Sequence, residues 1–314
     1  MARDTLICLA FRKLPIWFKR KAPTMPFPMD GFLSPEHCEF PVRLRSVPAY
    51  KAWFDFGKEL NRLGLAMLNG QNVPTEDNVR LTMAGLFVRA HKSMQAALIL
   101  CEMGLVGDAR AVLRTGVEGA IALNALANEP KFLDQLIEAN HFNRRKFARI
   151  VLDNPEYRSS YTADQIAEME RVVREVDEME SNARDTAQPP EKNLKGRRVS
   201  DINWAEAARK PCPDLYNLHY RLLSSDGTHT TIDSIGRSFE YEPGTGKILC
   251  VKVGPDISSL VETLKAACLM FLWAAIPFER AYNQPAAQVR LEEMMKRFTQ
   301  LPQDEPNASI APIF

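Results

Sequence analysis

The chain of 314 residues is long enough for one large domain or two small ones. Its 46% hydrophobic and 25% charged residues are ordinary for a soluble globular protein. With a formal net charge of +1, no global electrostatic field recruits nucleic acid or a membrane, although local basic patches are compatible with this value. The six cysteines include no CxxC pair, which argues against a disulfide framework or a structural zinc site and favours a reducing cytoplasm.

The N-terminal part of the sequence predicts an extended arm. Residues 1–21 carry six basic residues around short apolar runs, without the small-residue cleavage site of a signal peptide. Prolines then recur up to Pro48, and each lacks an amide donor. We therefore expect a proline-rich, basic arm over 1–46, a helical bundle domain over 47–285, and a short helix with a C-terminal tail over 286–314.

Two helical patterns precede the expected centre of the bundle. Ala49–Leu68 has apolar residues at a helical period, and Thr75–Met103 carries a second apolar stripe. Gly104 follows, and glycine commonly ends a helix because it takes the left-handed conformation freely. The short turn between Gly104 and Gly107 makes the next helix an antiparallel neighbour.

That next helix, Ala111–Ala127, is apolar or small nearly all round, which predicts a buried central position. Its only charges, Arg114 and Glu118, are four residues apart and share one face. Arg114 falls inside the core-facing arc, where a charge is costly unless it is paired. The pair is either a structural ion pair that fixes helix register or one side of a polar site.

A further helix begins at Pro130 and runs to about Leu152. On its helical wheel Asn140 and Arg144 fall in the middle of the apolar face. Two adjacent helices would then aim polar residues inward, and a shared polar pocket would satisfy them all.

The acidic segment after this helix begins with a capping box at Thr162 and Gln165 and continues to about Ala183. Its apolar stripe is narrow, which indicates a protruding hairpin or a helix–helix contact. Residues 162–183 are therefore the surface we expect for a homo-oligomer or a protein partner. The polar, basic segment Gln188–Asp201 predicts a mobile loop, with a phosphate contact as the alternative.

Asp214–Ser225 again has a helical pattern, and the residues expected to face inward are Leu215, Leu218 and Leu222. Ser225-Asp-Gly-Thr-His229 follows it. A histidine beside a hydroxyl and a carboxylate can transfer protons at neutral pH. The alternative is a structural turn with a capping histidine.

The last part of the chain predicts one β-hairpin over 238–253 with a glycine turn, a long helix to about Tyr282 and a short helix over 286–298. The longest uncharged apolar run, Ala266–Phe278, is shorter than the ~20 residues that span a bilayer, so we expect a core helix and no membrane span. His91 is expected at the surface or just behind a site. No tight metal-ligand spacing occurs, and the sequence predicts neither a metal nor a cofactor.

Two short motifs carry a resemblance. Arg114-Thr-x-x-Glu118 and the downstream Ser225-x-x-x-His229 resemble a broad group of bacterial all-helical proteins known only as a domain of unknown function, over about Ala49–Tyr282. The chain is also faintly similar to HEPN-type helical ribonucleases of toxin and antiphage systems. Their signature places a histidine four to six positions after an arginine, whereas seven residues separate Arg221 from His229 here.

The sequence thus predicts an all-α, multi-helix bundle with one small β-hairpin insertion. Our first hypothesis for its function is a bacterial, cytoplasmic stress or phage-defence effector that acts on RNA or a nucleotide through an inward-facing Arg/Glu/His pocket. The predicted catalytic residues are His229, Glu118 and Ser225. The predicted substrate-binding residues are Arg114, Asn140, Arg144 and Arg221, since the planar guanidinium suits phosphate. The alternatives are a non-catalytic sensor of small anions or nucleotides and a structural interaction protein.

Overall fold

A computed structural model of the chain describes residues 30–69, 71, 73, 75–186, 202–224, 232–242 and 244–306. The described elements confirm an all-α fold with one small β-hairpin. The larger elements are α2 (Glu39–Ser46), α3 (Pro48–Leu68), α4 (Asn78–Glu102), α5 (Val106–Asn128), α6 (Phe132–Asp153), α7 (Pro155–Ser159), α8 (Ala163–Thr186), α9 (Trp204–Arg209), η3 (Leu215–Tyr220), α10 (Arg221–Leu223), α11 (Ile232–Gly236), β1 (Phe239–Tyr241), β2 (Ile248–Val251), α12 (Leu260–Tyr282) and α13 (Pro285–Phe298).

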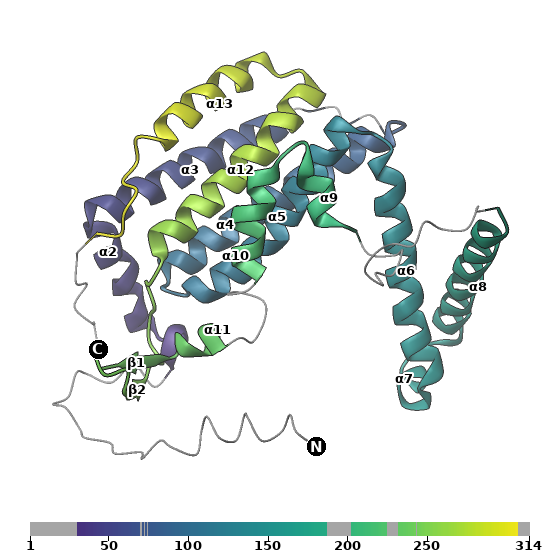
Figure 1. The fold of residues 1–314 in the computed structure, drawn as a ribbon, viewed down its shortest axis with the longest axis horizontal. Coiled ribbons are helices and arrows are strands. Elements are labelled where there is room, and N and C mark those ends of the chain that lie inside the picture. The colour runs from purple at the N-terminus through teal and green to yellow at the C-terminus, as the bar shows by residue number, and fades with distance from the viewer. Residues whose placement is uncertain are drawn as a thin grey trace.

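The centre of the bundle is formed by α4, α5 and α12, around which α2, α3 and α13 pack (Figure 1). Leu113, Val117 and Ile121 of α5 have no exposed surface, so the prediction that Ala111–Ala127 lies at the buried centre is confirmed. The three helices approach closely at Gly116, because this residue has no side chain. A Cβ added there would lie 2.7 Å from the Ser93 Cβ of α4 and 2.9 Å from the Met270 Cε of α12.

Helix α12 contains Pro277 in its interior, and a side chain of α5 replaces the hydrogen bond that this proline removes. Proline has no amide hydrogen, so the carbonyl of Trp273, four residues earlier, loses its helical donor. The Nδ2 of Asn124 donates to that carbonyl at 2.8 Å and also to the carbonyl of Ala120 at 2.8 Å. Among the described helices α12 alone is long and apolar enough to cross a membrane. However, 72% of its most apolar 18 residues are buried inside the protein, as in a core helix.

The C-terminal segment closes one end of the bundle. The Glu305 carboxylate accepts a hydrogen bond from the backbone amide of Val261 at 2.7 Å, within the first turn of α12, and one from the Tyr50 hydroxyl at 3.4 Å. The indole Nε1 of Trp53 donates to the Pro302 carbonyl at 2.8 Å. Glu305 thus supplies the cap that Ser259 does not, since the Ser259 side chain makes no capping hydrogen bond.

The extended arm predicted up to residue 46 is wrong over its last part, because Glu39–Ser46 forms helix α2. Phe40 and Leu44 of this helix are buried in the core. The prolines begin helices here instead of excluding them: Pro41 lies in the first turn of α2 and Pro48 is the first residue of α3. Proline is tolerated at these positions because the first amides of a helix have no internal acceptor. Residues 1–29 lie outside the described part of the chain.

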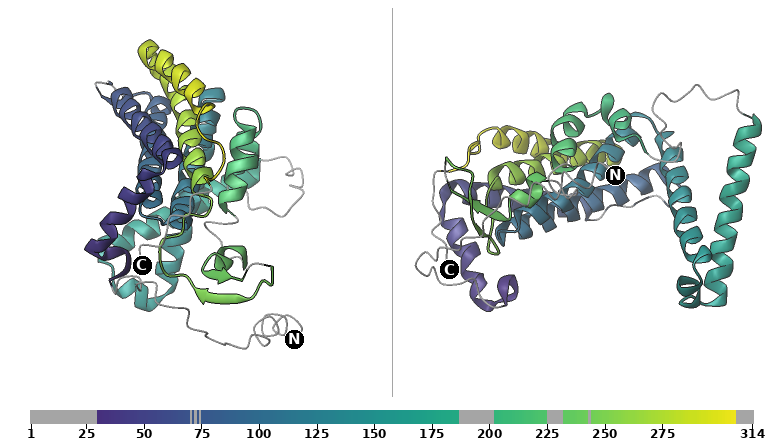
Figure 2. Two further views of the ribbon diagram at one scale, coloured as in Figure 1. Left: turned by 90° about the vertical axis from the view of Figure 1, so that its left-hand side faces the viewer. Right: turned by 60° about the horizontal axis from the view of Figure 1, so that its bottom comes forward.

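Helices α6, α7 and α8 form a hairpin that projects from the bundle (Figures 1 and 2). α8 packs on α6 and stands apart from the bundle. The capping box is confirmed: the Thr162 amide donates to the Gln165 Oε1 at 2.9 Å, and the Gln165 amide donates to the Thr162 Oγ1 at 3.3 Å. The expected protruding helix–helix contact is therefore present.

The β-hairpin is confirmed as an antiparallel pair of β1 and β2. Gly244 and Gly246 in its turn have φ angles of 82° and 67°, which glycine adopts without steric cost. Gly104 likewise ends α4 at a φ of 75°, and its carbonyl accepts from the Asp256 amide at 2.8 Å. This bond fixes the segment between β2 and α12 against the turn between α4 and α5.

Candidate functional site

The segment that covers α5 contains η3, a turn of π-helix, followed directly by α10. A π-helical turn has more residues per turn than an α-helix and is frequent at functional sites. It changes which leucines face inward: Leu215 and Leu223 are buried, whereas Leu218 and Leu222 are 62% and 37% exposed. The expectation that Leu218 and Leu222 point inward is therefore wrong, because it assumed an uninterrupted α-helical period.

Arg114 joins α5 to this segment. Its Nε donates to the Ser224 Oγ at 3.0 Å and its Nη2 donates to the Tyr220 hydroxyl at 3.1 Å. Its ion pair with Glu118, at 3.3 Å, confirms the predicted partner, and the Tyr220 hydroxyl also donates to Glu118 at 3.4 Å. The two charged side chains are 26% and 19% exposed, so the pair is half-buried beneath η3 and not sealed in the core.

Aromatic contacts make this network rigid. The Arg114 guanidinium lies 5.3 Å from the centre of the Tyr220 ring, and the Tyr216 and Tyr220 rings stack at 5.1 Å. Stacking and cation–π attraction each favour one orientation of these side chains. Arg114 directs its donors to Glu118, Tyr220 and Ser224. These contacts hold η3 against α5.

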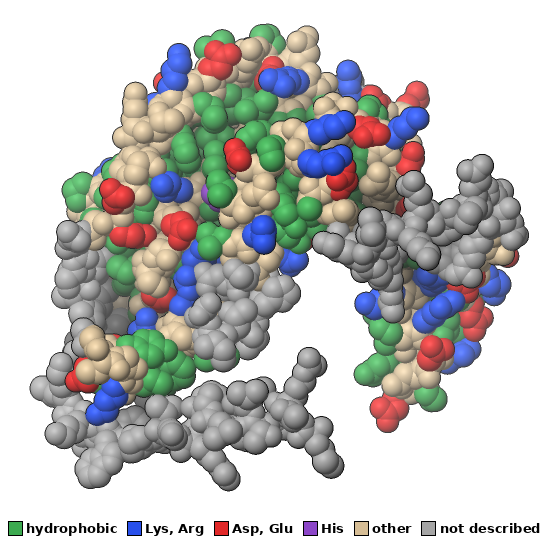
Figure 3. All heavy atoms as spheres, viewed as in Figure 1, with side chains coloured by type: hydrophobic (Ala, Val, Ile, Leu, Met, Phe, Trp, Pro, Cys, Tyr) green, Lys and Arg blue, Asp and Glu red, His purple; other side chains and the backbone are tan. Residues whose placement is uncertain are grey.

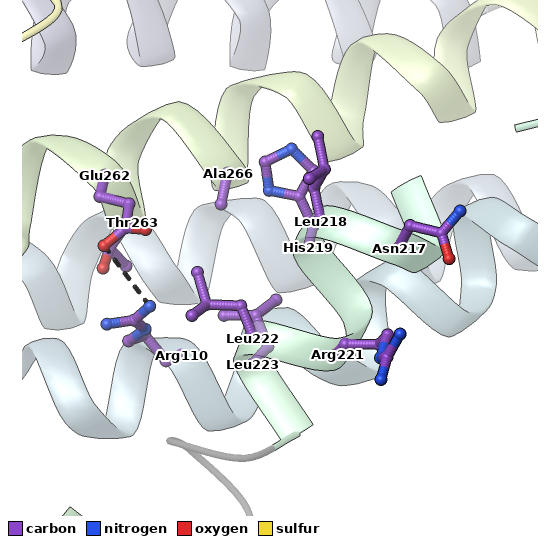
Figure 4. Close-up of a pocket in the computed structure, with 10 residues that line it drawn as sticks. All are labelled: Arg110, Asn217, Leu218, His219, Arg221, Leu222, Leu223, Glu262, Thr263 and Ala266. Atoms are coloured by element: carbon purple, nitrogen blue, oxygen red, sulfur yellow. Dashed lines mark ion pairs between the residues drawn. The ribbon is translucent and has the colours of Figure 1, made fainter. Parts of the chain in front are cut away.

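A pocket with a volume of about 590 Å³ lies beside this network, between η3, α10, α5 and α12 (Figure 4). One wall carries Arg110, which is only 2% exposed and pairs with Glu262 at 3.6 Å. The opposite end carries the imidazole of His219, close to Ala266 (Figure 4). The remaining lining residues are Asn217, Leu218, Arg221, Leu222, Leu223 and Thr263.

The electrostatics of the pocket are mixed. Burial lowers the pKa of His219, and the positive charge of Lys265 lowers it further, against the opposing effects of Glu262 and Asp214. Its imidazole is therefore neutral near pH 7 and able to accept a proton. In Figure 3 this face of the bundle shows hydrophobic, basic and acidic side chains side by side, without a single-sign field.

Of the predicted substrate-binding residues, Arg221 lines the pocket and Arg114 lies in the adjoining network. Asn140 and Arg144 do not line this pocket, so the prediction that they point inward to a pocket shared with Arg114 is wrong. Both are exposed on α6, and Arg144 pairs with Glu168 of α8 at 3.4 Å. The face of α6 that carries them packs along α8 and not against the bundle.

Among the predicted catalytic residues, Glu118 lies in the network with Arg114 and Tyr220. Ser225 and His229 lie outside the described residues, as does the basic segment 188–201, so their roles stay predictions. Within the described part of the chain, no three His, Cys, Asp or Glu side chains gather as metal ligands would.

Sequence reasoning missed Arg110 and His219. Arg110 lies one helical turn before Arg114, and it fell outside the range assigned to the central helix, which begins at Val106. Recognising the longer helix would have placed two arginines on neighbouring turns. His219 had no signal, because its position depends on the π-helical turn.

The predicted surface position of His91 is also wrong, because its side chain is only 3% exposed. Its Nε2 lies 2.8 Å from the Asn61 Oδ1, and its ring lies against Phe87 and Phe271. Burial lowers the pKa of His91, which indicates a neutral core histidine.

The model of a family described as "Family of unknown function (DUF5677)" matches residues 81–247, from α4 through the start of the β-hairpin. No curated protein and no solved structure matches the chain.

Proposed function

The chain belongs to a family of unknown function (DUF5677), and we propose that its pocket between η3, α10, α5 and α12 binds the phosphate of a nucleotide or of RNA. The observation that carries this proposal is the buried Arg110 at one end of a pocket that has neutral His219 at the other. Arg110 and Arg221 bind phosphate in this proposal, and His219 transfers protons.

The chemistry of Arg110 suits an anionic ligand. A planar guanidinium offers paired donors that match two phosphate oxygens. Its contact with Glu262, at 3.6 Å, is longer than a charge-assisted hydrogen bond. Glu262 is 53% exposed whereas Arg110 is 2% exposed, so the guanidinium is the buried member of this ion pair.

The apolar part of the pocket suits the remainder of a nucleotide. Leu222, Leu223 and Ala266 lie between Arg110 and His219, and Leu218 lines the pocket beside His219 (Figure 4). Pockets for organic ligands are commonly apolar with a few placed polar groups. In RNA, neutral His219 would accept the proton of a ribose 2′-hydroxyl. The 2′-oxygen would attack the adjacent phosphorus, the 5′-oxygen would leave with a proton from water, and a 2′,3′-cyclic phosphate would remain.

The roles of Arg114 and Glu118 change in this proposal. Their network with Tyr220 and Ser224 uses the donors that a phosphate would need. We assign them to positioning: they hold η3 on α5, and η3 in turn carries His219.

The test is a binding titration of the full chain with fluorescein-labelled oligoribonucleotides and with a panel of mononucleotides. The informative variant is Arg221→Gln, because this exposed side chain carries little of the fold. We expect it to weaken binding about tenfold, equivalent to ~1.4 kcal/mol. Arg158→Gln, an exposed arginine of the distant hairpin, is the matched control and should leave binding unchanged. Wild-type protein that binds none of these ligands would end the proposal.

A turnover assay distinguishes the two versions of the proposal, a catalytic protein and a non-catalytic binding module. Cleavage of the oligoribonucleotides or hydrolysis of a nucleotide, lost in His219→Gln while binding persists, would establish the catalytic version. Binding without turnover in the wild type would leave a nucleotide or small-anion sensor, which was the alternative from the sequence.

The wider role that we propose is a cytoplasmic stress or phage-defence effector. A cytoplasmic location is supported by the free cysteines among the described residues, three of which, Cys101, Cys212 and Cys268, are in the core. The biological test is growth arrest or phage resistance on expression, which His219→Gln and Arg221→Gln should abolish at equal protein levels.

A further inference from the structure

The α6–α8 hairpin has two unlike faces. On one face, Arg145 and Arg149 of α6 both donate to the Asp177 carboxylate, at 2.9 Å and 2.8 Å. Burial raises the pKa of Asp177, but these hydrogen bonds outweigh it and the pKa lies below its usual value. The charges of this face satisfy one another within one chain.

The other face is apolar and hollowed. A groove with a volume of about 410 Å³ runs between α6 and α8. Its apolar lining comes from Phe147 and Ala148 of α6 and from Met169 and Val172 of α8. Phe147 is 54% exposed even though it lines the groove.

The apolar surface continues along both helices. Ile150 lies one turn after Phe147 and is 51% exposed, and Met179 lies two turns after Val172 and is also 51% exposed. Side chains of this size gain free energy when they are removed from water. The hairpin stands apart from the bundle, so the described helices of the bundle do not cover these side chains.

We infer that this face of the hairpin is a homodimer interface, where the hairpins of two copies of the chain pack into an antiparallel four-helix bundle. The charges of this face already pair within one chain, since Arg144 on its α6 side lies 3.4 Å from Glu168 on its α8 side. What remains for a partner to cover is therefore apolar. A second copy presents the same apolar surface with its charges paired in the same way, as an isologous interface requires.

The dimensions of the hairpin also fit. A helix of 24 residues, such as α8, is about 36 Å long, and two helices side by side are about 20 Å wide. Each hairpin thus offers a face of roughly 700 Å², and two facing hairpins bury about 1,400 Å², within the range of stable protein–protein interfaces.

The test is sedimentation equilibrium of the full chain at micromolar concentrations. We expect a mass of twice the 35.5 kDa of one chain. The double variant Phe147→Glu/Ile150→Glu should sediment as a monomer, because it places charges in the apolar contact. Ile99→Glu is the matched control: Ile99 is 61% exposed on α4 of the bundle, and the variant should remain dimeric.

Far-ultraviolet circular dichroism shows whether the double variant is folded, so that loss of the dimer can be told from unfolding. Since both substituted side chains are already about half exposed, we expect an unchanged helical signal. A wild-type monomer over the whole concentration range would overturn the inference, and so would a double variant that folds and remains dimeric.

Discussion

The bundle and the α6–α8 hairpin contain helices of nearly equal length that differ in how they are held. α5, with 23 residues, buries fourteen of them, whereas α6, with 22 residues, buries only four. α5 is enclosed by α4, α12 and η3, and its charged residues Arg110, Arg114 and Glu118 each have specific partners. α6 meets α8 along one narrow stripe flanked by exposed ion pairs, which contribute little individually. The bundle is therefore held by burial on many sides, whereas the hairpin is held by a single apolar stripe.

The largest effect should come from the bundle core. Phe87 has no exposed surface and stacks on Phe278 at 4.2 Å. Phe87→Ala should lower the free energy of unfolding by about 3–5 kcal/mol, because the close-packed surroundings cannot fill the cavity. Urea denaturation followed by circular dichroism measures it. A loss below about 1 kcal/mol would mean that the centre of the bundle is loosely packed.

The next effect tests the contact between α5 and the proline of α12. Asn124→Ala leaves the Trp273 carbonyl without its donor and should cost about 1–3 kcal/mol of stability. The control is the same substitution in a Pro277→Ala background, where an amide is restored to the helix and the cost should shrink. Equal costs in both backgrounds would contradict our explanation of Asn124.

A buried residue of the hairpin should matter less and only locally. Val176 is 2% exposed, and Val176→Ala removes two methyl groups, worth about 1.6 kcal/mol. Hydrogen exchange should show lost protection in α6 and α8 and unchanged protection in α4, α5 and α12. Equal loss throughout would show that the hairpin and the bundle unfold as one unit.

Glu118→Ala should cost only about 1 kcal/mol, because Arg114 keeps its hydrogen bonds to Tyr220 and Ser224. Full burial of Arg114, as expected from the sequence, would have implied about 3–5 kcal/mol. Thermal denaturation distinguishes the two values. The larger loss would indicate that η3 seals this pair from water in solution.

The smallest effect is a pH dependence in the bundle. Hydrogen bonds from Arg297 hold the pKa of Glu59 below its ordinary value of 4.5. A lowered pKa means that the unfolded chain binds the proton more readily, so this contribution is complete above pH 4.5 and is lost as the pH falls further. We expect less than about 1 kcal/mol, since the pair is partly exposed. Glu59→Gln should remove this part of the acid sensitivity, and an unchanged profile would contradict it.

Periodicity predicted most of the bundle, because an apolar stripe implies burial wherever a neighbour is available. Periodicity identified the central helix, and local motifs identified the stop at Gly104, the capping box at Thr162 and the glycine turn of the β-hairpin. These features depend on residues close together in the sequence. The Arg114–Glu118 pair was predictable for the same reason.

The remainder of the site was not predictable from local pattern. A helical wheel shows that Asn140 and Arg144 share a face, but not that this face packs along α8. His91 is buried by Asn61 and Phe271, which come from two other helices. The π-helical turn that places His219 depends on contacts with α5 and has no composition of its own.

The carboxylate of Glu305 at the first turn of α12 has a consequence for the order of folding during synthesis. Every helix of the described bundle precedes Glu305 in the chain. Until this segment has left the ribosome, α12 lacks its cap and Trp53 lacks its hydrogen bond to Pro302. The bundle is therefore completed by the segment up to Glu305, after all of its helices have been synthesised.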